Sequence, residues 1–263
     1  MQYKKIACVA DKTESSKKLL KHLIEKYQVI DVDNNQNIET FDIIVVIGGD
    51  GFMLHSLHRF INFHIPFYGI NRGTVGFLLN SFDPSIDDLL QKIQSSVKTD
   101  IFPLSMEVLT KAGHHKVKTA INEVSILRQS NQSASIRVLI DGKERMKELV
   151  GDGVMVATAA GSSAYNFSVG GTIFPLDSKI LALTPISPFR PRRWRGALLP
   201  HKSVVTFEIK NCTKRPVNAV ADFHEIADAK EITVREDTGK KITLLFDPSH
   251  SLEDRIIKEQ FSY

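Results

Sequence analysis

The stretch that decides the fold is "FDIIVVIGGDGFMLHSLHRFINFHIPFYGIN", residues 41–71. An apolar run of strand length passes through Gly48-Gly49-Asp50-Gly51 into apolar residues at helical spacing, and a second strand pattern follows. The first strand pattern is apolar on both faces, as expected of a strand inside a parallel sheet. Strand, helix and strand in this order predict a right-handed βαβ unit of an open α/β sheet.

The alternation continues on both sides of this unit. The segment "KKIACVA" (4–10) predicts a strand, and "SSKKLLKHLIEKY" (15–27) and "SIDDLLQKIQSS" (85–96) predict helices. From about residue 100, short alternating segments separated by turn residues predominate, and Asp141-Gly142 is a strong signal for a two-residue hairpin.

We therefore predict an α/β fold joined to an all-β one. Residues 1–98 are expected to form an open, Rossmann-like α/β domain, and residues 99–246 an antiparallel, β-rich, sandwich-like domain. The tail "SLEDRIIKEQF" (251–261) has a helical pattern with Ser251 as its N-cap. We expect this helix, within residues 247–263, to return to the first domain because an isolated helix of that length is marginally stable.

The composition is typical of a soluble globular protein, since 42% of the 263 residues are hydrophobic and 24% are charged. No apolar run approaches the roughly 20 residues of a membrane span, and the N-terminus lacks the features of a signal peptide. Cys8 and Cys212 lie far apart without a CxxC pattern, which favours a reducing compartment. We expect a cytoplasmic protein with no structural zinc, no disulfide and no membrane partner.

The net charge of +4 is unevenly spread, because "RPRRWRG" (190–196) holds four arginines around one tryptophan. This arginine cluster is either a solvated loop or subunit contact, or a wall that binds phosphate. No nucleic-acid recognition motif accompanies it, so nucleic acid is not an expected partner.

The Gly-Gly-Asp-Gly turn is the first candidate site. Glycines let a backbone approach a ligand closely, and the N-terminus of a helix presents unpaired N–H groups that suit phosphate. Asp50 itself suits a hydroxyl, and the combination favours phosphorylation of a hydroxyl beside a bound phosphate chain. The alternative is that Asp50 only caps the helix.

Two further stretches have polar or glycine-rich turns at strand ends. "NRGTVGF" (71–77) follows a strand, so its glycines and Arg72 either line the same crevice as the first turn or form an ordinary loop. Asn122-Glu123 interrupts a strand pattern in "TAINEVSI", where the pair either reads an adenine edge and ribose hydroxyls or is a solvated strand end. Neighbouring strand residues point to opposite faces, so both can meet one ligand only if the strand ends or bends.

The fourth stretch is "GDGVMVATAAGSSAYNFSVGG" (151–171), with five glycines and several hydroxyl groups. We predict a strand at 154–157, a turn of small residues, and a helix near 163–167. The hydroxyls and backbone amides suit a nucleotide, Tyr165 offers a ring for stacking, and Asp152 is a second acceptor. The alternative is close packing of chain segments.

His55 and His58 lie at i and i+3 on the predicted helix, a spacing that would suit a metal. No third ligand is evident, so we predict no protein-held metal and expect His55 to contact phosphate.

Together these four stretches resemble the NAD kinase family, whose members phosphorylate NAD to NADP. The sequences "GGDG", "NRGTVGFL", "NE" and "GDG" followed by "AGSSAY" occur in the family's order and approximate spacing, and they span nearly the whole chain. "GGDG" alone would also fit phosphofructokinases and diacylglycerol-type lipid kinases.

The resemblance implies a role for each matching position. Asp50 would be the catalytic carboxylate, hydrogen-bonded to the 2′-hydroxyl of the adenosine ribose, and Asn122 and Glu123 would bind the adenosine. Asp152 would contact the nicotinamide end. The remaining implied contacts with the dinucleotide are Gly51, Phe77, Ser163, Ala164, Tyr165, Ser168, Ser187 and His224. The glycine turns and the helix start, read from the residues themselves, are the expected contacts with the phosphate donor: Gly48, Gly49, Gly51, His55 and Arg72.

The resemblance also implies NAD and ATP or polyphosphate as substrates, a divalent cation, Mg²⁺, held mainly by the donor's phosphates, and a homodimer or homotetramer. The sequence departs from the family pattern at Phe52, where threonine is usual, and at Val150, where arginine or lysine is frequent. It also has "TAAGSSAY" for "TPTGSTAY" and "DFH" (222–224) for "DGQ". A lipid kinase and a non-catalytic NAD(P)-binding sensor remain as alternatives.

Overall fold

The computed structural model describes residues 3–32 and 37–248 and divides into two compact units. The first comprises Met1–Ile101 with Lys240–Tyr263, and the second comprises Phe102–Gly239. The helix expected at 251–261, with Ser251 as its N-cap, lies outside the described residues. No described helix is long and apolar enough to cross a membrane.

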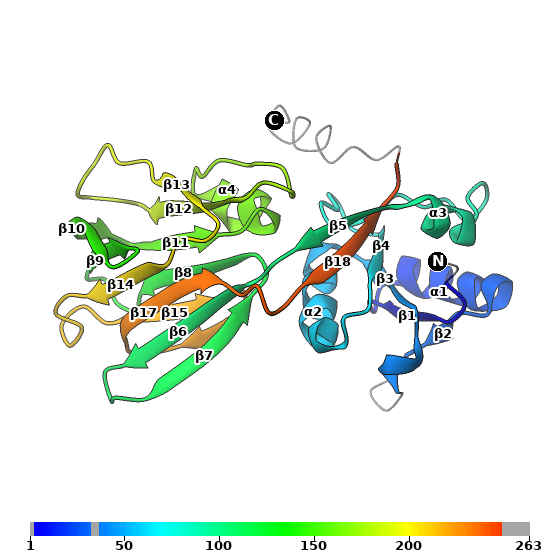
Figure 1. The fold of residues 1–263 in the computed structure, drawn as a ribbon, viewed down its shortest axis with the longest axis horizontal. Coiled ribbons are helices and arrows are strands. Elements are labelled where there is room, and N and C mark those ends of the chain that lie inside the picture. Colours follow the sequence, from blue (N-terminus) through cyan, green and yellow to red (C-terminus); the bar gives the residue numbers. More distant parts are fainter. Residues whose placement is uncertain (1–2, 33–36, 249–263) are drawn as a thin grey trace. The chain divides into compact units, whose positions relative to one another are not determined.

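The first unit contains one six-stranded sheet with the order β2-β1-β3-β4-β18-β5 (Figure 1). The first five strands are parallel to their neighbours, and β5 pairs antiparallel with β18. The strands are β1 Ile6–Ala10, β2 Ile30–Asp31, β3 Ile43–Gly48, β4 Phe67–Asn71, β5 Val97–Ile101 and β18 Ile242–Phe246. The helices are α1 Glu14–Tyr27, α2 Asp50–Phe60 and α3 Leu89–Ser95, with 3-10 turns at Ile38–Thr40 and Ile61–Phe63.

Every residue of β3 is buried, as the apolar run predicts, because helices cover the sheet on both faces. Ile43, Val45 and Ile47 pack in one cluster with leucines of α1 and α3. Successive strand residues face opposite sides, so Ile44 and Val46 face away from this cluster, and α2 packs against β3 (Figure 1). The predicted open α/β fold is confirmed.

The last strand differs from the expected boundaries. The sequence pattern predicts that residues 242–246 belong to the β-rich part, but β18 pairs with β4 and β5 in the first sheet. Its alternating pattern suits an antiparallel sheet equally well. Only the fold reveals its partners, so the β-rich unit ends near Gly239 rather than at residue 246.

The second unit contains two antiparallel six-stranded sheets, with the orders β10-β9-β14-β17-β6-β7 and β13-β12-β11-β8-β15-β16. One hydrophobic core includes residues from both sheets, such as Phe207 and Ile232 from one and Val124 and Val156 from the other. The strands are β6 Leu104–Thr110, β7 His115–Ala120, β8 Glu123–Arg128, β9 Ala134–Ile140, β10 Lys143–Gly151, β11 Gly153–Ala157, β12 Ile180–Ile186, β13 Ala197–Pro200, β14 Val205–Ile209, β15 Val217–Ala221, β16 His224–Ile226 and β17 Ala229–Glu236. A 3-10 turn, Ala160–Ser163, and the short helix α4, Tyr165–Ser168, follow β11.

The hairpin predicted at Asp141-Gly142 joins β9 to β10. Asp141 has φ 52° and Gly142 has φ 73°, the left-handed pair that a type I′ turn requires. This hairpin and the core that the two sheets share confirm the expected β-rich sandwich.

Candidate active site

The Gly-Gly-Asp-Gly turn lies at the carboxyl end of β3. Gly49 is the N-cap of α2 and Asp50 is its first residue, but the cap has no side-chain hydrogen bond. Instead, Asp50 Oδ2 accepts from the Gly76 N–H at 2.9 Å and Oδ1 accepts from the Leu78 N–H at 3.0 Å. Capping of α2 therefore does not explain the carboxylate, which holds the second glycine loop.

The loop after β4 packs directly against the turn after β3. The Arg72 N–H donates to the Gly48 carbonyl at 2.9 Å, and a Cβ on Gly73 would lie 3.0 Å from the Gly49 Cα. Gly76 has φ 82°, and any Cβ there would overlap the Asn71 side chain. The structure therefore brings the two glycine turns into contact within the first unit.

The Arg72 guanidinium is bound to the protein itself, because it donates to the carbonyls of Asn71 (2.8 Å) and Phe82 (2.9 Å). Burial lowers the pKa of Arg72, against an opposing effect from Asp83. His55 lies on the exposed side of α2, one turn beyond Asp50.

A carboxylate that the sequence analysis missed, Asp11, lies beside the same turn at the end of β1. A Cβ on Gly48 would lie 3.0 Å from the Asp11 Oδ2 atom and 2.9 Å from the Phe52 ring. Burial raises the pKa of Asp11, but hydrogen bonds from Thr13 and Ser16 outweigh burial and lower it overall. Phe52 therefore has a packing role, since its ring covers Gly48 where a larger residue would not fit.

In the second unit the chain bends between β7 and β8, so Ile121 and Asn122 belong to neither strand. The Asn122 Oδ1 and Glu123 Oε2 atoms are buried and have no hydrogen-bond partner. Burial, with a smaller contribution from the charge of Asp222, raises the pKa of Glu123 to about 8. Two buried polar oxygens without hydrogen-bond partners are costly in a folded protein, which marks this bend as a place for a polar ligand.

The turn after β11 packs on this bend. The Thr158 hydroxyl lies 2.7 Å from the Ile121 carbonyl oxygen, and a Cβ on Gly161 would lie only 2.1 Å from the Asn122 carbonyl oxygen. Glu123 and Ala157 are register partners of β8 and β11. The structure thus brings together "NE" and "AGSSAY", which are separated by more than thirty residues in the chain.

Within "AGSSAYNFS" the side chains alternate between structural and accessible positions. Asn166 is fully buried and bonds to Ser162, Thr172 and Thr184, which fixes the turn. The partly or fully exposed residues include all the predicted ligand contacts in this stretch, Ser163, Ala164, Tyr165 and Ser168, together with Phe167. The sequence analysis did not identify Asn166, because its partners appear only when the turn closes.

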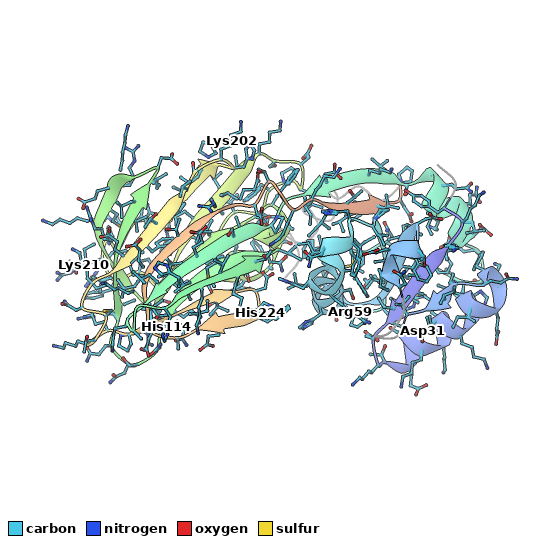
Figure 2. The ribbon with its side chains drawn as sticks, turned by 60° about the horizontal axis from the view of Figure 1, so that its bottom comes forward. Asp31, Arg59, His114, Lys202, Lys210 and His224 are labelled. Carbon is cyan, nitrogen blue, oxygen red and sulfur yellow. The ribbon has the colours of Figure 1, made fainter. Side chains whose placement is uncertain are left out.

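His224 begins β16 at the same end of the sheet. It is the register partner of Ala221, which in turn pairs with Val124 of β8. Figure 2 shows His224 at the end of the β-rich unit opposite Lys210. His224 therefore lies near the "NE" bend.

Asp152 and Ser187 lie elsewhere. Asp152 precedes β11, whose five residues span roughly 13 Å at 3.3 Å per residue, and the "NE" bend adjoins the other end of that strand. The Asp152 carboxylate accepts from Arg128 Nε at 2.6 Å, and the Asp152 N–H donates to the carbonyl before Ser187. Within one chain these two residues are not brought together with Asn122 and Glu123.

The described part of the chain, residues 3–32 and 37–248, has no group of three or more histidine, cysteine, aspartate or glutamate side chains placed to hold a metal ion. His55 and His58 therefore gain no third ligand there. Phosphate oxygens of a bound substrate are suitable ligands for a divalent cation.

Comparisons with known proteins agree with these features. Residues 2–98 match the family model of the ATP-NAD kinase N-terminal domain, and residues 121–236 match that of the ATP-NAD kinase C-terminal domain. The NAD kinase of Rickettsia bellii is 49% identical over 261 residues, which cover 99% of each chain. That of Rickettsia felis is 52% identical over 241 residues, 92% of this chain and 94% of the relative.

Solved structures show the same fold. The crystal structure of yeast NADH kinase complexed with NADH has a TM-score of 0.82 at 23% identity and covers 99% of this chain and 89% of its own. An NAD kinase from Archaeoglobus fulgidus in complex with ATP has a TM-score of 0.75 at 24% identity, and the match covers 96% of this chain and 98% of that kinase. With both family models matched and curated relatives half identical along nearly its full length, the chain belongs to the NAD kinase family.

Proposed function

We propose that the protein transfers a phosphoryl group to the 2′-hydroxyl of the adenosine ribose of NAD and so forms NADP. The observation that carries the proposal is the pair of buried oxygens without hydrogen-bond partners, Asn122 Oδ1 and Glu123 Oε2. The adenine amino group of NAD can donate to the amide oxygen, and its ribose hydroxyls can donate to or accept from the carboxyl group. Membership in the NAD kinase family supports the same substrate.

In this proposal Asp50 acts on the reacting hydroxyl. The amides of Gly76 and Leu78 fix the carboxylate, and each oxygen keeps a lone pair that can accept a hydrogen bond from the 2′-hydroxyl. The hydroxyl oxygen bonds to the terminal phosphorus as the bond from phosphorus to the donor's bridging oxygen breaks, and the hydroxyl proton passes to Asp50 late. Orientation is the main contribution, as is usual for phosphoryl transfer.

The phosphate donor is proposed to lie on the turn at the start of α2. Gly48, Gly49 and Gly51 give backbone access, with open space beside Gly51, and the helix N-terminus favours anions. His55 and Arg72 complete this group, although Arg72 must exchange a carbonyl partner to reach phosphate. ATP or polyphosphate is the proposed donor, and Mg²⁺ bound to its phosphates supplies charge neutralisation.

The proposed dinucleotide contacts on the β-rich unit lie in two places, and Gly51 and Phe77 are proposed contacts from the first unit. The adenosine end is proposed to use the bend at Asn122 and Glu123. The nicotinamide end is proposed to use Asp152 and Ser187, since the two ends of an extended dinucleotide need separated contacts. The other proposed contacts are Gly51, Phe77, Ser163, Ala164, Tyr165, Ser168 and His224.

A coupled assay tests the proposal. The purified protein is mixed with NAD, ATP and Mg²⁺, and NADP is detected with an NADP-specific dehydrogenase. NADP formation that Asp50→Asn abolishes supports the kinase. Tight binding of NAD(P) without turnover would instead identify a sensor, and phosphorylation of a lipid but not of NAD would identify a lipid kinase.

We also propose a cytoplasmic homo-oligomer, a dimer or tetramer, that meets through the β-rich unit. That unit has the edge strands β7, β10, β13 and β16, and Val117 and Leu198 on two of them are exposed. Light scattering after size-exclusion chromatography measures the number of subunits, and a monomer would contradict the proposal.

A further inference from the structure

The carboxylate of Asp222 accepts three consecutive backbone N–H groups at the bend between β7 and β8. Its oxygens lie 2.6 Å from the nitrogen of Ile121, 3.0 Å from that of Asn122 and 3.1 Å from that of Glu123. The three donors precede Asp222 by about a hundred residues. Hydrogen bonds to a charged acceptor are the stronger class, so this one side chain determines the path of the backbone there.

Asp222 itself occupies a two-residue turn between β15 and β16. Ala221 and His224 are register partners, Asp222 has φ 53°, and its own N–H donates to the Glu123 carbonyl at 3.1 Å. Phe223 is not among the residues with positive φ. This accounts for "DFH" in place of "DGQ", because the left-handed position falls on the aspartate and leaves its successor free to carry a side chain.

The carbonyl groups of the same bend are held from the other side by Thr158. Its hydroxyl lies 2.7 Å from the Ile121 oxygen and 3.1 Å from the Asn122 oxygen, and its N–H donates to the latter at 2.9 Å. The Gly161 N–H donates to the Thr158 hydroxyl in turn. The N–H and C=O groups of the bend thus have separate, dedicated partners.

This arrangement resolves a geometric difficulty of the "NE" pair. Adjacent residues of a regular strand point to opposite faces, so Asn122 and Glu123 could not meet the same ligand from within one. Here β7 stops at Ala120 and β8 starts at Glu123, and each of the two side chains has a buried oxygen without a hydrogen-bond partner. The charge of Asp222 also contributes, after burial, to the raised pKa of Glu123, which places the two carboxyl groups in one environment.

We propose that Asp222 and Thr158 are positioning residues that hold Asn122 and Glu123 in the bend required to recognise the adenosine of the acceptor substrate. The inference rests on the proposed function and adds to it two residues that do not need to touch the ligand. Asp222 acts through the backbone N–H groups, and Thr158 acts through the carbonyls.

Steady-state kinetics of four variants test the proposal. Asp222→Asn and Thr158→Val are expected to raise the KM for NAD at least about tenfold, with the KM for ATP and kcat within about threefold of wild type. Thr158→Ser keeps the hydroxyl and is expected to restore the KM for NAD. The matched control is Asp141→Asn, because Asp141 also lies at positive φ in a two-residue hairpin and accepts a distant backbone N–H, that of Val204.

The outcomes separate the possible failures. A wild-type enzyme that forms no NADP defeats the proposed function. An active wild type whose Asp222→Asn and Thr158→Val variants both keep a normal KM for NAD defeats only this inference. Equal rises in both KM values together with a lower melting temperature would make the two residues structural, which also overturns it. If Asp222→Asn does not fold, the comparison of Thr158→Val with Thr158→Ser decides the question.

Discussion

At the scale of single residues, the role of Asp50 is the one that the structure clarifies most. Read alone, a carboxylate among glycines at a helix start has capping as a serious alternative. The structure shows both oxygens bound to amides of the loop after β4, some 26 to 28 residues further along the chain. That side chain joins the two glycine turns and leaves lone pairs for a hydroxyl.

The first prediction concerns Asp50→Asn. The amide keeps the shape but cannot take the hydroxyl proton, and its NH₂ group faces one of the two backbone donors. We expect turnover to fall at least about 10²-fold while the Kd for NAD stays within a few-fold. Asp88→Asn, which alters the N-cap of α3, is the control and should leave turnover intact. Near wild-type turnover of Asp50→Asn would remove this carboxylate from the mechanism.

The second prediction concerns Glu123, whose pKa is raised from 4.5 to about 8 by burial and by Asp222. The folded protein keeps this proton where the unfolded chain releases it, so stability falls as the pH rises from about 4.5 to 8. Glu123→Gln cannot ionise and should exceed the wild type in unfolding free energy by about 4–5 kcal/mol at pH 9 and by about 1 kcal/mol at pH 5.

Urea unfolding at both pH values measures this difference. Glu231→Gln, an exposed position in the same unit, should show no such pH dependence. An equal effect of Glu123→Gln at pH 5 and pH 9 would contradict the assignment of a proton to Glu123.

At the scale of elements, the site depends on direct contacts between backbones. Gly73 lies against Gly49 in the first unit, and Gly161 lies against the Asn122 carbonyl in the second. The sequence predicted the strands, the helices and the glycine turns, because these follow from local periodicity and turn chemistry. It could not predict that Asp222 and Thr158 hold the "NE" bend, because their partners are distant in the chain.

The third prediction tests one such contact. Gly161→Ala places a Cβ 2.1 Å from the Asn122 carbonyl oxygen, and a backbone atom cannot move aside without distorting the bend. We expect a loss of about 1–3 kcal/mol in unfolding free energy and a raised KM for NAD.

Gly239→Ala is the matched control. The nearest atom to its Cβ is a side-chain oxygen of Asp237 at 3.3 Å, so the change should be nearly neutral. Chemical denaturation of both variants checks the difference, and equal stabilities would show that the bend tolerates displacement.

At the scale of the whole molecule, the chain builds an α/β unit, then a β sandwich, and returns to the first sheet with β18. The return is secured by a buried network in which Asp247 accepts from the Tyr68 hydroxyl at 2.7 Å and from Lys92 Nζ at 2.8 Å. The described residues, 3–32 and 37–248, provide no cluster that would hold a metal ion without a substrate.

The fourth prediction concerns the divalent cation. Because the cation is proposed to bind through the donor's phosphates, EDTA should stop NADP formation yet leave the melting temperature of the ligand-free protein unchanged. Added Mg²⁺ should restore full turnover at once. A melting temperature that falls on chelation would reveal a cation held by the protein itself.

The sequence by itself determined the α/β and β-rich halves, the hairpin at Asp141-Gly142 and the four stretches that point to NAD kinase, because each depends on local pattern. The tertiary structure decided where β18 pairs, what Asp50 holds, and that Asp222 and Thr158 shape the bend at Asn122 and Glu123. It also placed Asp152 at the other end of β11. These features depend on contacts between segments distant in the chain, and local periodicity carries no information about such partners.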